Sequence, residues 1–247
     1  MNSQKKPSLH TVLSPALLSS YDLSDSVVVV IDVLRATSTI ATALYNGAKE
    51  VIPVDSVAEC IQLGKKLNAI TAGERDGSIA EGLTYGNTPF QYTEKFIKGK
   101  SLVLTTTNGT KLLHLAVAAN AQKIITASFC NLSSVCEYLV QQNKNVLLAC
   151  SAWKNRVNFE DTLMAGAIIH RIKDNFQINC DSCRMAELLF SQAGENLFEF
   201  MKENNASHYN RLMGFGLEED LRYCFTIDNA NCVNLYENGR LTALKNP

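Results

Sequence analysis

The stretch from Ser26 to Val33 constrains the fold most, because it is rich in β-branched residues and its apolar residues do not alternate with polar ones. A strand with one face in water alternates, so an unbroken apolar run predicts a strand buried on both faces. The stretch 145–151 has the same character. Strands of this kind belong to parallel sheets that helices cover on each side.

Helical patterns lie between the predicted strands along the first two thirds of the chain. Strands are predicted at 26–33, 49–54, 69–72, 101–106, 123–127 and 145–151, and helices at 37–45, 56–68, 111–119, 132–142 and 159–172. Right-handed strand–helix–strand connections then give an α/β fold with three α/β/α layers and a largely parallel central sheet.

The last quarter of the chain has a different pattern. It predicts a long helix at 181–204, a short helix at 217–223, and a strand pair within 225–241 that turns at Glu237-Asn238-Gly239. A glycine-rich loop is predicted at 73–87. No linker or internal repeat interrupts these patterns, so we expect one domain over residues 1–247.

Composition excludes several classes of partner. The formal net charge is −1, whereas binding to nucleic acid or to an anionic membrane surface needs a surplus of Lys and Arg. The longest aliphatic run, Val27 to Ile31, is too short to span a bilayer, and no long apolar stretch follows the N-terminus, so a cytoplasmic protein is expected. A small anionic ligand needs only local cations and stays compatible with this charge. Homo-oligomerisation is left open.

The eight cysteines are too sparse for a disulfide scaffold, and most lie in apolar segments where Cys packs as a small hydrophobe. Cys180 and Cys183 form the single CxxC motif. A zinc ribbon would need a second such pair, and no HxxxH or HExxH motif accompanies this one. Packing is the favoured interpretation, with structural zinc or redox chemistry as the alternative.

Ligands of parallel α/β sheets bind where strands end and helices begin. The loop after the first buried strand has Asp32 at the strand end, then Arg35, then the hydroxyls of Thr37, Ser38 and Thr39 at a helix start. A helix start and an arginine suit phosphate oxygens, and Asp32 suits either a divalent cation or a nucleophile's role. The alternative is an N-cap and an acid that merely ends a strand.

Two further loops are expected at the same edge of the sheet. Glu74 and Arg75 follow a strand and suit a metal ligand and an anion clamp, although an exposed ion pair is an equal alternative. Asn108-Gly109-Thr110 would ordinarily mark a hairpin. The helical period of the residues that follow predicts a strand-to-helix turn instead, and with it a second anion cradle.

A fourth loop adds cations beside the only tryptophan. The loop 151–156 contains Lys154 and Arg156, and Glu160 and Asp161 open the helix that follows. An N-cap accounts for one of these acids, and two acids beside two cations also suit a metal ligand or a general acid–base role. Arg211 is a further cation, and His208 is a weaker candidate that could reach the site.

Together these loops resemble the 2-phosphosulfolactate phosphatase (ComB-like) family. The matching pieces are residues 30–39, 73–77, 85–89, 106–110, 158–161, 165–166, 207–208, 211–212, 216 and 220–221. The resemblance implies an α/β/α hydrolase that uses Mg²⁺ to remove phosphate from 2-phospho-3-sulfolactate, a step towards coenzyme M. The stretch 151–156 departs from the small, glycine-containing loop of many members.

We therefore expect a small anionic phosphate ester as the partner and Mg²⁺ as the cofactor. Asp32, with Glu74 or Asp161, would hold the metal, while Arg35 and Arg75 clamp the phosphate. Phosphate oxygens would meet Thr37, Ser38, Thr39, Asn108, Gly109 and Thr110, and a carboxylate or sulfonate would meet Lys154, Arg156 or Arg211. The alternatives are a non-catalytic sensor of a phosphorylated or sulfonated metabolite, and an enzyme for another organophosphate or sulfonate.

Overall fold

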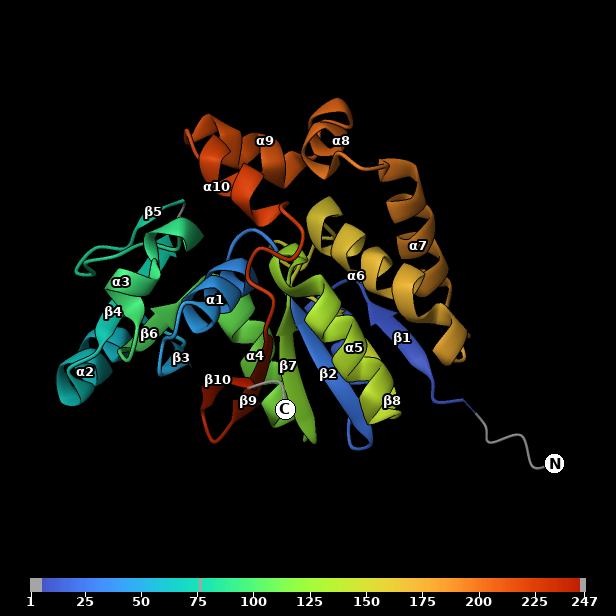
Figure 1. Ribbon diagram of the computed structural model, residues 1–247, viewed down its shortest axis with the longest axis horizontal. Coiled ribbons are helices and arrows are strands. Elements are labelled where there is room, and N and C mark those ends of the chain that lie inside the picture. The colour runs from blue at the N-terminus through green and yellow to red at the C-terminus, as the bar shows by residue number, and fades with distance from the viewer. Residues whose placement is uncertain (1–5, 76, 245–247) are drawn as a thin grey trace.

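The apolar run at 26–33 forms strand β2 (Ser26–Ile31) inside a ten-stranded sheet, in a computed structural model that describes residues 6–75 and 77–244 (Figure 1). From Val27 to Ile31, the odd-numbered side chains enter one apolar core and the even-numbered ones enter the other. All five are at most 1% exposed. This two-sided burial explains why the run shows no alternation.

Ten strands and ten α-helices alternate along most of the described chain. The strands are β1 (Leu9–Val12), β2 (Ser26–Ile31), β3 (Glu50–Val54), β4 (Ile70–Arg75), β5 (Ser78–Ile79), β6 (Ser101–Thr105), β7 (Lys123–Ala127), β8 (Asn145–Cys150), β9 (Val233–Glu237) and β10 (Arg240–Leu244). The helices are α1 (Ala36–Tyr45), α2 (Val57–Leu67), α3 (Glu94–Ile97), α4 (Gly109–Ala118), α5 (Leu132–Gln142), α6 (Phe159–Ile172), α7 (Asp181–Ala193), α8 (Leu197–Glu203), α9 (Ser207–Gly214) and α10 (Glu218–Cys224). Short 3₁₀ turns lie at Pro15–Ser20, Pro89–Gln91, Phe129–Asn131 and Lys173–Asn175.

The strands follow the order β1-β8-β2-β7-β9-β10-β3-β6-β4-β5. Strands β1, β8, β2 and β7 pair in parallel, and so do β3, β6 and β4. The C-terminal hairpin β9–β10 lies between these two halves and pairs antiparallel with β7 on one side and β3 on the other. The predicted α/β class with a C-terminal strand pair is confirmed. The sequence does not predict that this hairpin lies inside the sheet.

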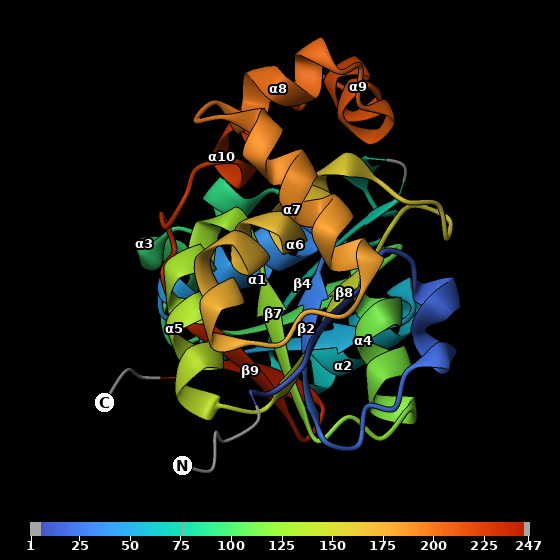
Figure 2. The ribbon, with the colours of Figure 1, turned by 90° about the vertical axis from the view of Figure 1, so that its right-hand side faces the viewer.

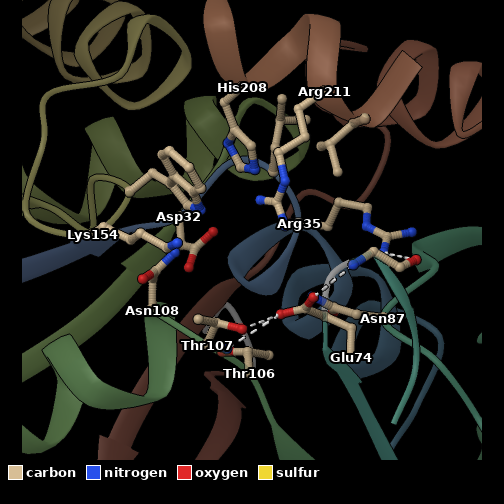
Figure 3. Close-up of a pocket in the computed structure, with 14 residues that line it drawn as sticks. Asp32, Arg35, Glu74, Asn87, Thr106, Thr107, Asn108, Lys154, His208 and Arg211 are labelled. Carbon is tan, nitrogen blue, oxygen red and sulfur yellow. Dashed lines mark hydrogen bonds between the residues drawn. The ribbon is translucent and has the colours of Figure 1, made fainter. Parts of the chain in front are cut away.

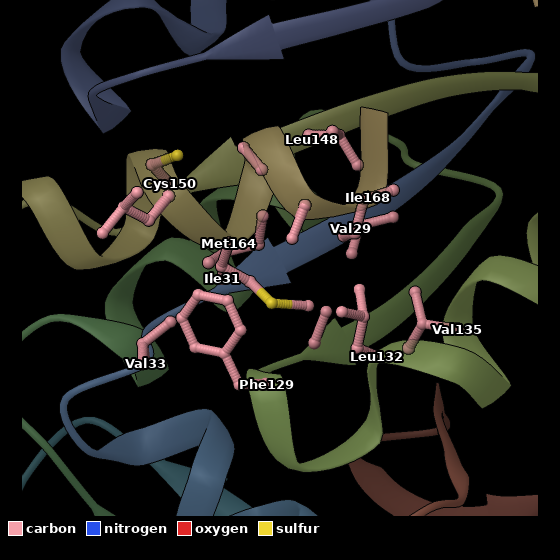
Figure 4. Packing of buried hydrophobic residues seen from close by; sticks show 14 of the residues in the cluster. Val29, Ile31, Val33, Phe129, Leu132, Val135, Leu148, Cys150, Met164 and Ile168 are labelled. Atoms are coloured by element: carbon pink, nitrogen blue, oxygen red, sulfur yellow. The ribbon is translucent and has the colours of Figure 1, made fainter. Parts of the chain in front are cut away.

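Helices cover both faces of the sheet. Helices α5, α6 and α7 contribute to the core that holds Val29 and Ile31, where Met164 of α6 lies near Phe129 and Ile168 lies near Val29 (Figure 4). Helices α1 and α4 contribute to the opposite core. Helices α8, α9 and α10 form a cap at one end of the molecule (Figures 1 and 2). Among the described helices, none is long and apolar enough to cross a membrane.

Most of the predicted elements are confirmed within two residues, and two predictions are wrong. The helix at 181–204 is two helices, because Gly194 has a φ of +63° and the side chain of Asn196 starts α8 by accepting a hydrogen bond from the Glu199 amide. Part of the stretch 73–87, predicted as a loop, is strand: β4 extends to Arg75 and pairs antiparallel with β5. Asp76 in that stretch lies outside the described residues. The short elements β1, α3 and α9 are additions to the predicted set.

Helices α6 and α7 approach each other at Gly166, which gives a stability prediction. A methyl group on Gly166 would lie 2.1 Å from the backbone oxygen of Ala186, so the two helices would have to move apart. We expect Gly166→Ala to lower the free energy of unfolding by about 2 kcal/mol, although alanine favours a helix by about 1 kcal/mol. Urea denaturation measures this change.

Gly214→Ala is the matched control, because a methyl group on Gly214, at the end of α9, meets no atom within 4 Å. This variant should keep the wild-type stability or gain up to about 1 kcal/mol from the helix preference of alanine. Equal stabilities of the two variants would contradict close packing at Gly166.

Candidate active site

A pocket opens where strands β2, β4, β6 and β8 end, with α9 of the cap above it (Figure 3). Its lining residues are Asp32, Leu34, Arg35, Glu74, Gly77, Asn87, Thr106, Thr107, Asn108, Trp153, Lys154, His208, Arg211 and Leu212. The four polar loops identified in the sequence therefore meet at one place. The pocket spans both parallel halves of the sheet, because β4 and β6 belong to one half and β2 and β8 to the other.

Asp32 faces this pocket and is only 6% exposed. Gly109, at the start of α4, lies directly against it: a Cβ on Gly109 would sit 2.7 Å from Asp32 Oδ2. Burial raises the pKa of Asp32 to about 6; the nearby His208 lowers this pKa and the Glu74 carboxylate raises it. A cation bound beside Asp32 would favour its ionised form.

Glu74 reaches the pocket from the end of β4. Its Oε1 accepts hydrogen bonds from the hydroxyl and the amide of Thr107, at 2.8 and 3.3 Å, and its Oε2 accepts one from the Gly77 amide at 3.3 Å (Figure 3). These bonds orient the carboxylate without burying it. Asp32 and Glu74 thus offer hard oxygen atoms to one pocket, which is the donor type that Mg²⁺ prefers.

The structure gives Asp161 a different role from the predicted one. Its Oδ1 accepts a hydrogen bond from the Val33 amide at 2.9 Å. Its Oδ2 accepts three more, from Ser151 Oγ at 3.0 Å, the Ala152 amide at 3.1 Å and Asn158 Nδ2 at 3.0 Å. Asp161 is fully buried, does not line the pocket, and joins the loops after β2 and β8 to the start of α6. The prediction that it binds the metal is not supported, because both of its oxygens are already engaged.

No group of three His, Cys, Asp or Glu residues that could hold a metal ion is found within 6–75 and 77–244. The three acids predicted as metal ligands therefore do not form one cluster. A cation at Asp32 and Glu74 would complete its shell with water, hydroxyl or ligand oxygens.

His208 and Glu160 form a buried pair at the wall of the pocket. Nδ1 of His208 lies 2.5 Å from Glu160 Oε1, and the two side chains are 9% and 1% exposed. Burial by itself lowers the pKa of His208, but the carboxylates of Glu160, Asp32 and Asp161 more than offset this, so the pKa lies above its ordinary value. An imidazolium held by a carboxylate can donate a proton to a bound ligand.

Only a weak signal in the sequence points to this pair. His208 and Glu160 are 48 residues apart, and the pattern around His208 does not predict α9. The adjacent acids at 160 and 161 are equivalent as a pattern. The structure separates them: Glu160 binds the histidine, and Asp161 binds backbone and side-chain donors.

Trp153 positions two of the cations that line the pocket. Lys154 Nζ lies 4.8 Å from the centre of the indole ring, and the guanidinium carbon of Arg211 lies 5.0 Å from it. These distances are those of cation–π contacts. The ring therefore holds together a cation from the loop after β8 and one from α9, two elements far apart in sequence.

Lys154 sits at the tip of a two-residue turn. Lys154 and Asn155 have φ values of +51° and +61°, and the flanking Trp153 and Arg156 exchange two backbone hydrogen bonds of 2.9 Å. Left-handed backbone costs about 1 kcal/mol for each residue other than glycine, and such conformations cluster at functional sites. This turn directs Lys154 to the pocket, whereas Arg156 is exposed and does not line it.

Arg35 lines the pocket, and two other side chains hold its guanidinium in place. Its Nη1 lies 2.6 Å from Asp220 Oδ1 in a salt bridge whose two side chains are buried, and it also donates to Thr88 Oγ1 at 3.3 Å. The partner Asp220 belongs to α10 of the cap. Arg35 therefore ties the loop after β2 to the cap.

The hydroxyls at the start of α1, predicted to bind phosphate, donate instead to backbone oxygens of the protein. Thr37 and Ser38 donate to the backbone oxygens of Asp32 and Val33, each at 2.8 Å, and Thr39 donates to that of Asn87 at 3.1 Å. None of these three lines the pocket. They fix the loop that presents Asp32, so the prediction that they bind phosphate is not supported.

Two other predicted residues also turn away from the pocket. Thr110 donates to the Thr106 backbone oxygen at 3.0 Å. Arg75 donates to the Glu74 backbone oxygen at 2.6 Å and to Thr105 Oγ1 at 3.2 Å. Asn108, from the same predicted cradle as Thr110, does line the pocket.

Comparisons with known proteins agree on one family. A family model described as 2-phosphosulpholactate phosphatase matches residues 12–239. A protein of Thermotoga maritima is 43% identical over 211 residues, which cover 85% of this chain and 89% of its own. A protein of Caldanaerobacter subterraneus is 38% identical over 90% of this chain and 92% of its own, and one of Clostridium perfringens is 35% identical over 96% of each. All three are named probable 2-phosphosulfolactate phosphatase.

The raised pKa of Asp32 predicts that its charge destabilises the metal-free protein. Folding raises this pKa from 3.8 to about 6. The contribution of Asp32 to the free energy of unfolding is therefore highest near pH 4, where Asp32 is protonated in the folded state, and it falls as the pH rises through 6 and Asp32 ionises. At about pH 8, Asp32→Asn should raise the free energy of unfolding by about 1–3 kcal/mol, and near pH 4 the gain should vanish. Urea denaturation with a chelator present at both pH values measures this. A gain that does not change with pH would contradict the assignment.

Proposed function

The chain belongs to the 2-phosphosulfolactate phosphatase family, and on this basis we propose that it hydrolyses 2-phospho-3-sulfolactate, or a closely related phosphorylated hydroxy acid, to the free hydroxy acid and phosphate. The observation that carries the proposal is that one pocket holds the carboxylates of Asp32 and Glu74 together with the cations of Lys154 and Arg211. A pocket that only binds anions would gain nothing from carboxylates that face the anion. An enzyme that neutralises a phosphoryl group through a metal ion needs both.

The metal in this proposal is Mg²⁺, held by Asp32 and Glu74. Mg²⁺ is commonly bound through one or two carboxylates together with substrate phosphate oxygens, so two acids suffice. Thr106, Thr107 and Asn108 line the same wall and add oxygen atoms. When bound, the ion would neutralise charge on the phosphoryl oxygens and polarise the phosphorus–oxygen bond.

Lys154 and Arg211 bind the anionic groups of the substrate. The proposed substrate carries a carboxylate and a sulfonate as well as the phosphate, so cations are needed at more than one point. Trp153 contacts both cations through its indole ring and so holds them at the pocket. Arg35, held by its buried salt bridge to Asp220, adds a third cationic side chain to the pocket lining.

His208 protonates the leaving oxygen. Hydrolysis of an alkyl phosphate releases an alkoxide, which needs a proton as the bond breaks. Glu160 engages Nδ1 and keeps the ring charged, so Nε2 is left for the substrate. Asp161 takes no part in this step and holds the loops that carry the reacting groups.

Phosphate release from a panel of phosphorylated hydroxy acids, with and without Mg²⁺, tests the proposed function. We expect turnover of 2-phospho-3-sulfolactate or a near relative only when Mg²⁺ is present. Lys154→Gln should lower kcat/KM by about ten- to a hundredfold, because it removes one ionic contact with the substrate. Arg156→Gln is the matched control from the same turn and should stay within about twofold of wild type. Absence of turnover on every panel member would contradict the proposal and favour a sensor.

The pH dependence of kcat tests the role of His208. A general acid works only while protonated, so kcat should fall as the pH rises through the pKa of His208. Burial lowers this pKa and Glu160 raises it, so Glu160→Gln should move the alkaline limb of the profile to lower pH. His208→Gln should lower kcat by about 10²- to 10⁴-fold. An alkaline limb that stays in place in Glu160→Gln would contradict this assignment.

A further inference from the structure

Two cysteines outside the pocket carry chemistry that phosphate hydrolysis does not use. Cys180 is the N-cap of α7 and Cys183 lies in its first turn, with the two Sγ atoms 3.4 Å apart. Cys183 Sγ also contacts the Leu9 backbone oxygen at 3.4 Å. Leu9 pairs with Val146 near the start of β8, whereas the pocket lies beyond the end of β8. The dithiol therefore lies apart from the active site.

The two sulfur atoms differ in access and in charge. Cys180 is half-buried, and its Sγ accepts a hydrogen bond from the Cys183 amide at 3.4 Å, whereas Cys183 is fully buried. The hydrogen bond from the Cys183 thiol lowers the pKa of Cys180 to about 4, with help from the Cys183 and Thr11 amides and from His10, while the pKa of Cys183 is raised. An accessible thiolate followed one turn later by a buried thiol is the arrangement that thiol–disulfide exchange requires.

The other six cysteines differ from Cys180 in the pKa of their thiols. Cys60, Cys130, Cys136, Cys150 and Cys224 are buried, and Cys232 is half-buried. Burial raises the pKa of each of these six thiols, so they stay protonated at neutral pH. A zinc site at Cys180 and Cys183 would need further ligands, and no suitable group of three exists in the described part of the chain.

We propose that Cys180 and Cys183 form a redox-active dithiol that low-molecular-weight disulfides oxidise. The Cys180 thiolate attacks one sulfur of the small disulfide, so that a Cys180–S bond forms, the S–S bond of the reagent breaks, and the departing thiolate takes a proton from water. Cys183 then loses its proton to water and attacks Cys180 Sγ, which forms the Cys180–Cys183 disulfide and releases the second thiolate to be protonated. The dithiol loses two electrons, and the small disulfide gains them as two thiols.

Little movement is needed for the second step. The sulfurs must close from 3.4 Å to the bond length of about 2.05 Å, within one turn of α7. Cys183 already points at Cys180, so the mixed disulfide has its resolving thiol in place. The first attack meets Cys180, because Cys183 has no exposed surface.

Mass spectrometry of the full chain treated with oxidised glutathione tests the proposal. The wild type should lose two hydrogens and retain no glutathione, because Cys183 resolves the mixed disulfide. Cys183→Ser should retain one glutathione, on Cys180, and Cys180→Ser should show neither change. Cys232→Ser, which removes the other half-buried thiol, is the matched control and should behave as wild type. A wild type that keeps its two hydrogens, or that carries glutathione on another cysteine, would overturn the proposal.

Alkylation of the wild type gives a second readout that needs no variant to fold. With iodoacetamide at about pH 6, Cys180 should react at least about tenfold faster than Cys232, because only its thiol is ionised there. Peptide mapping of the labelled protein measures both rates. Equal rates would overturn the proposal.

Discussion

Several carboxylates are gathered at the carboxyl end of the sheet, and the cost of burying them organises the site around them. Asp32, Glu160 and Asp161 are each at most 6% exposed. A buried charge persists only where donors or opposite charges meet it. Asp161 meets four donors from three segments, yet burial and the neighbouring Glu160 and Asp32 still raise its pKa to about 8. Glu160 meets His208 and so attaches α9 to the body of the protein. Asp32 alone of the three lines the pocket, where a ligand can meet its charge.

The C-terminal hairpin makes this arrangement possible. Because β9–β10 lies between the two parallel halves of the sheet, the last strands of the chain join β7 to β3. Asp32 comes from one half and Glu74 from the other, so the pocket depends on this junction as well as on the local loops. The cap is joined to the same region through the Arg35–Asp220 salt bridge and the His208–Glu160 pair.

Sequence patterns suffice for the local elements and for the edge where the site lies, since strand burial and helix starts are read from neighbouring residues. They do not show which polar side chains form hydrogen bonds within the protein and which line the pocket. Thr37 lies in the first turn of α1 and Asn108 is the N-cap of α4, yet the hydroxyl of Thr37 donates to the Asp32 backbone oxygen and Asn108 lines the pocket. The His208–Glu160 contact depends on the packing of α9 over α6, for which no local pattern exists. The break at Gly194 escapes prediction because helices tolerate a single glycine.

The most direct test of Asp32 as a magnesium ligand is calorimetric titration of Mg²⁺ into the protein, in buffers of different ionisation enthalpy. With the pKa of Asp32 raised to about 6 in the metal-free state, Mg²⁺ binding at about pH 6 must displace a fraction of a proton. We expect this proton release at about pH 6, its loss at about pH 8, and weak or absent Mg²⁺ binding in Asp32→Asn. Binding without proton release at about pH 6, or with unchanged affinity in Asp32→Asn, would contradict a metal site at Asp32.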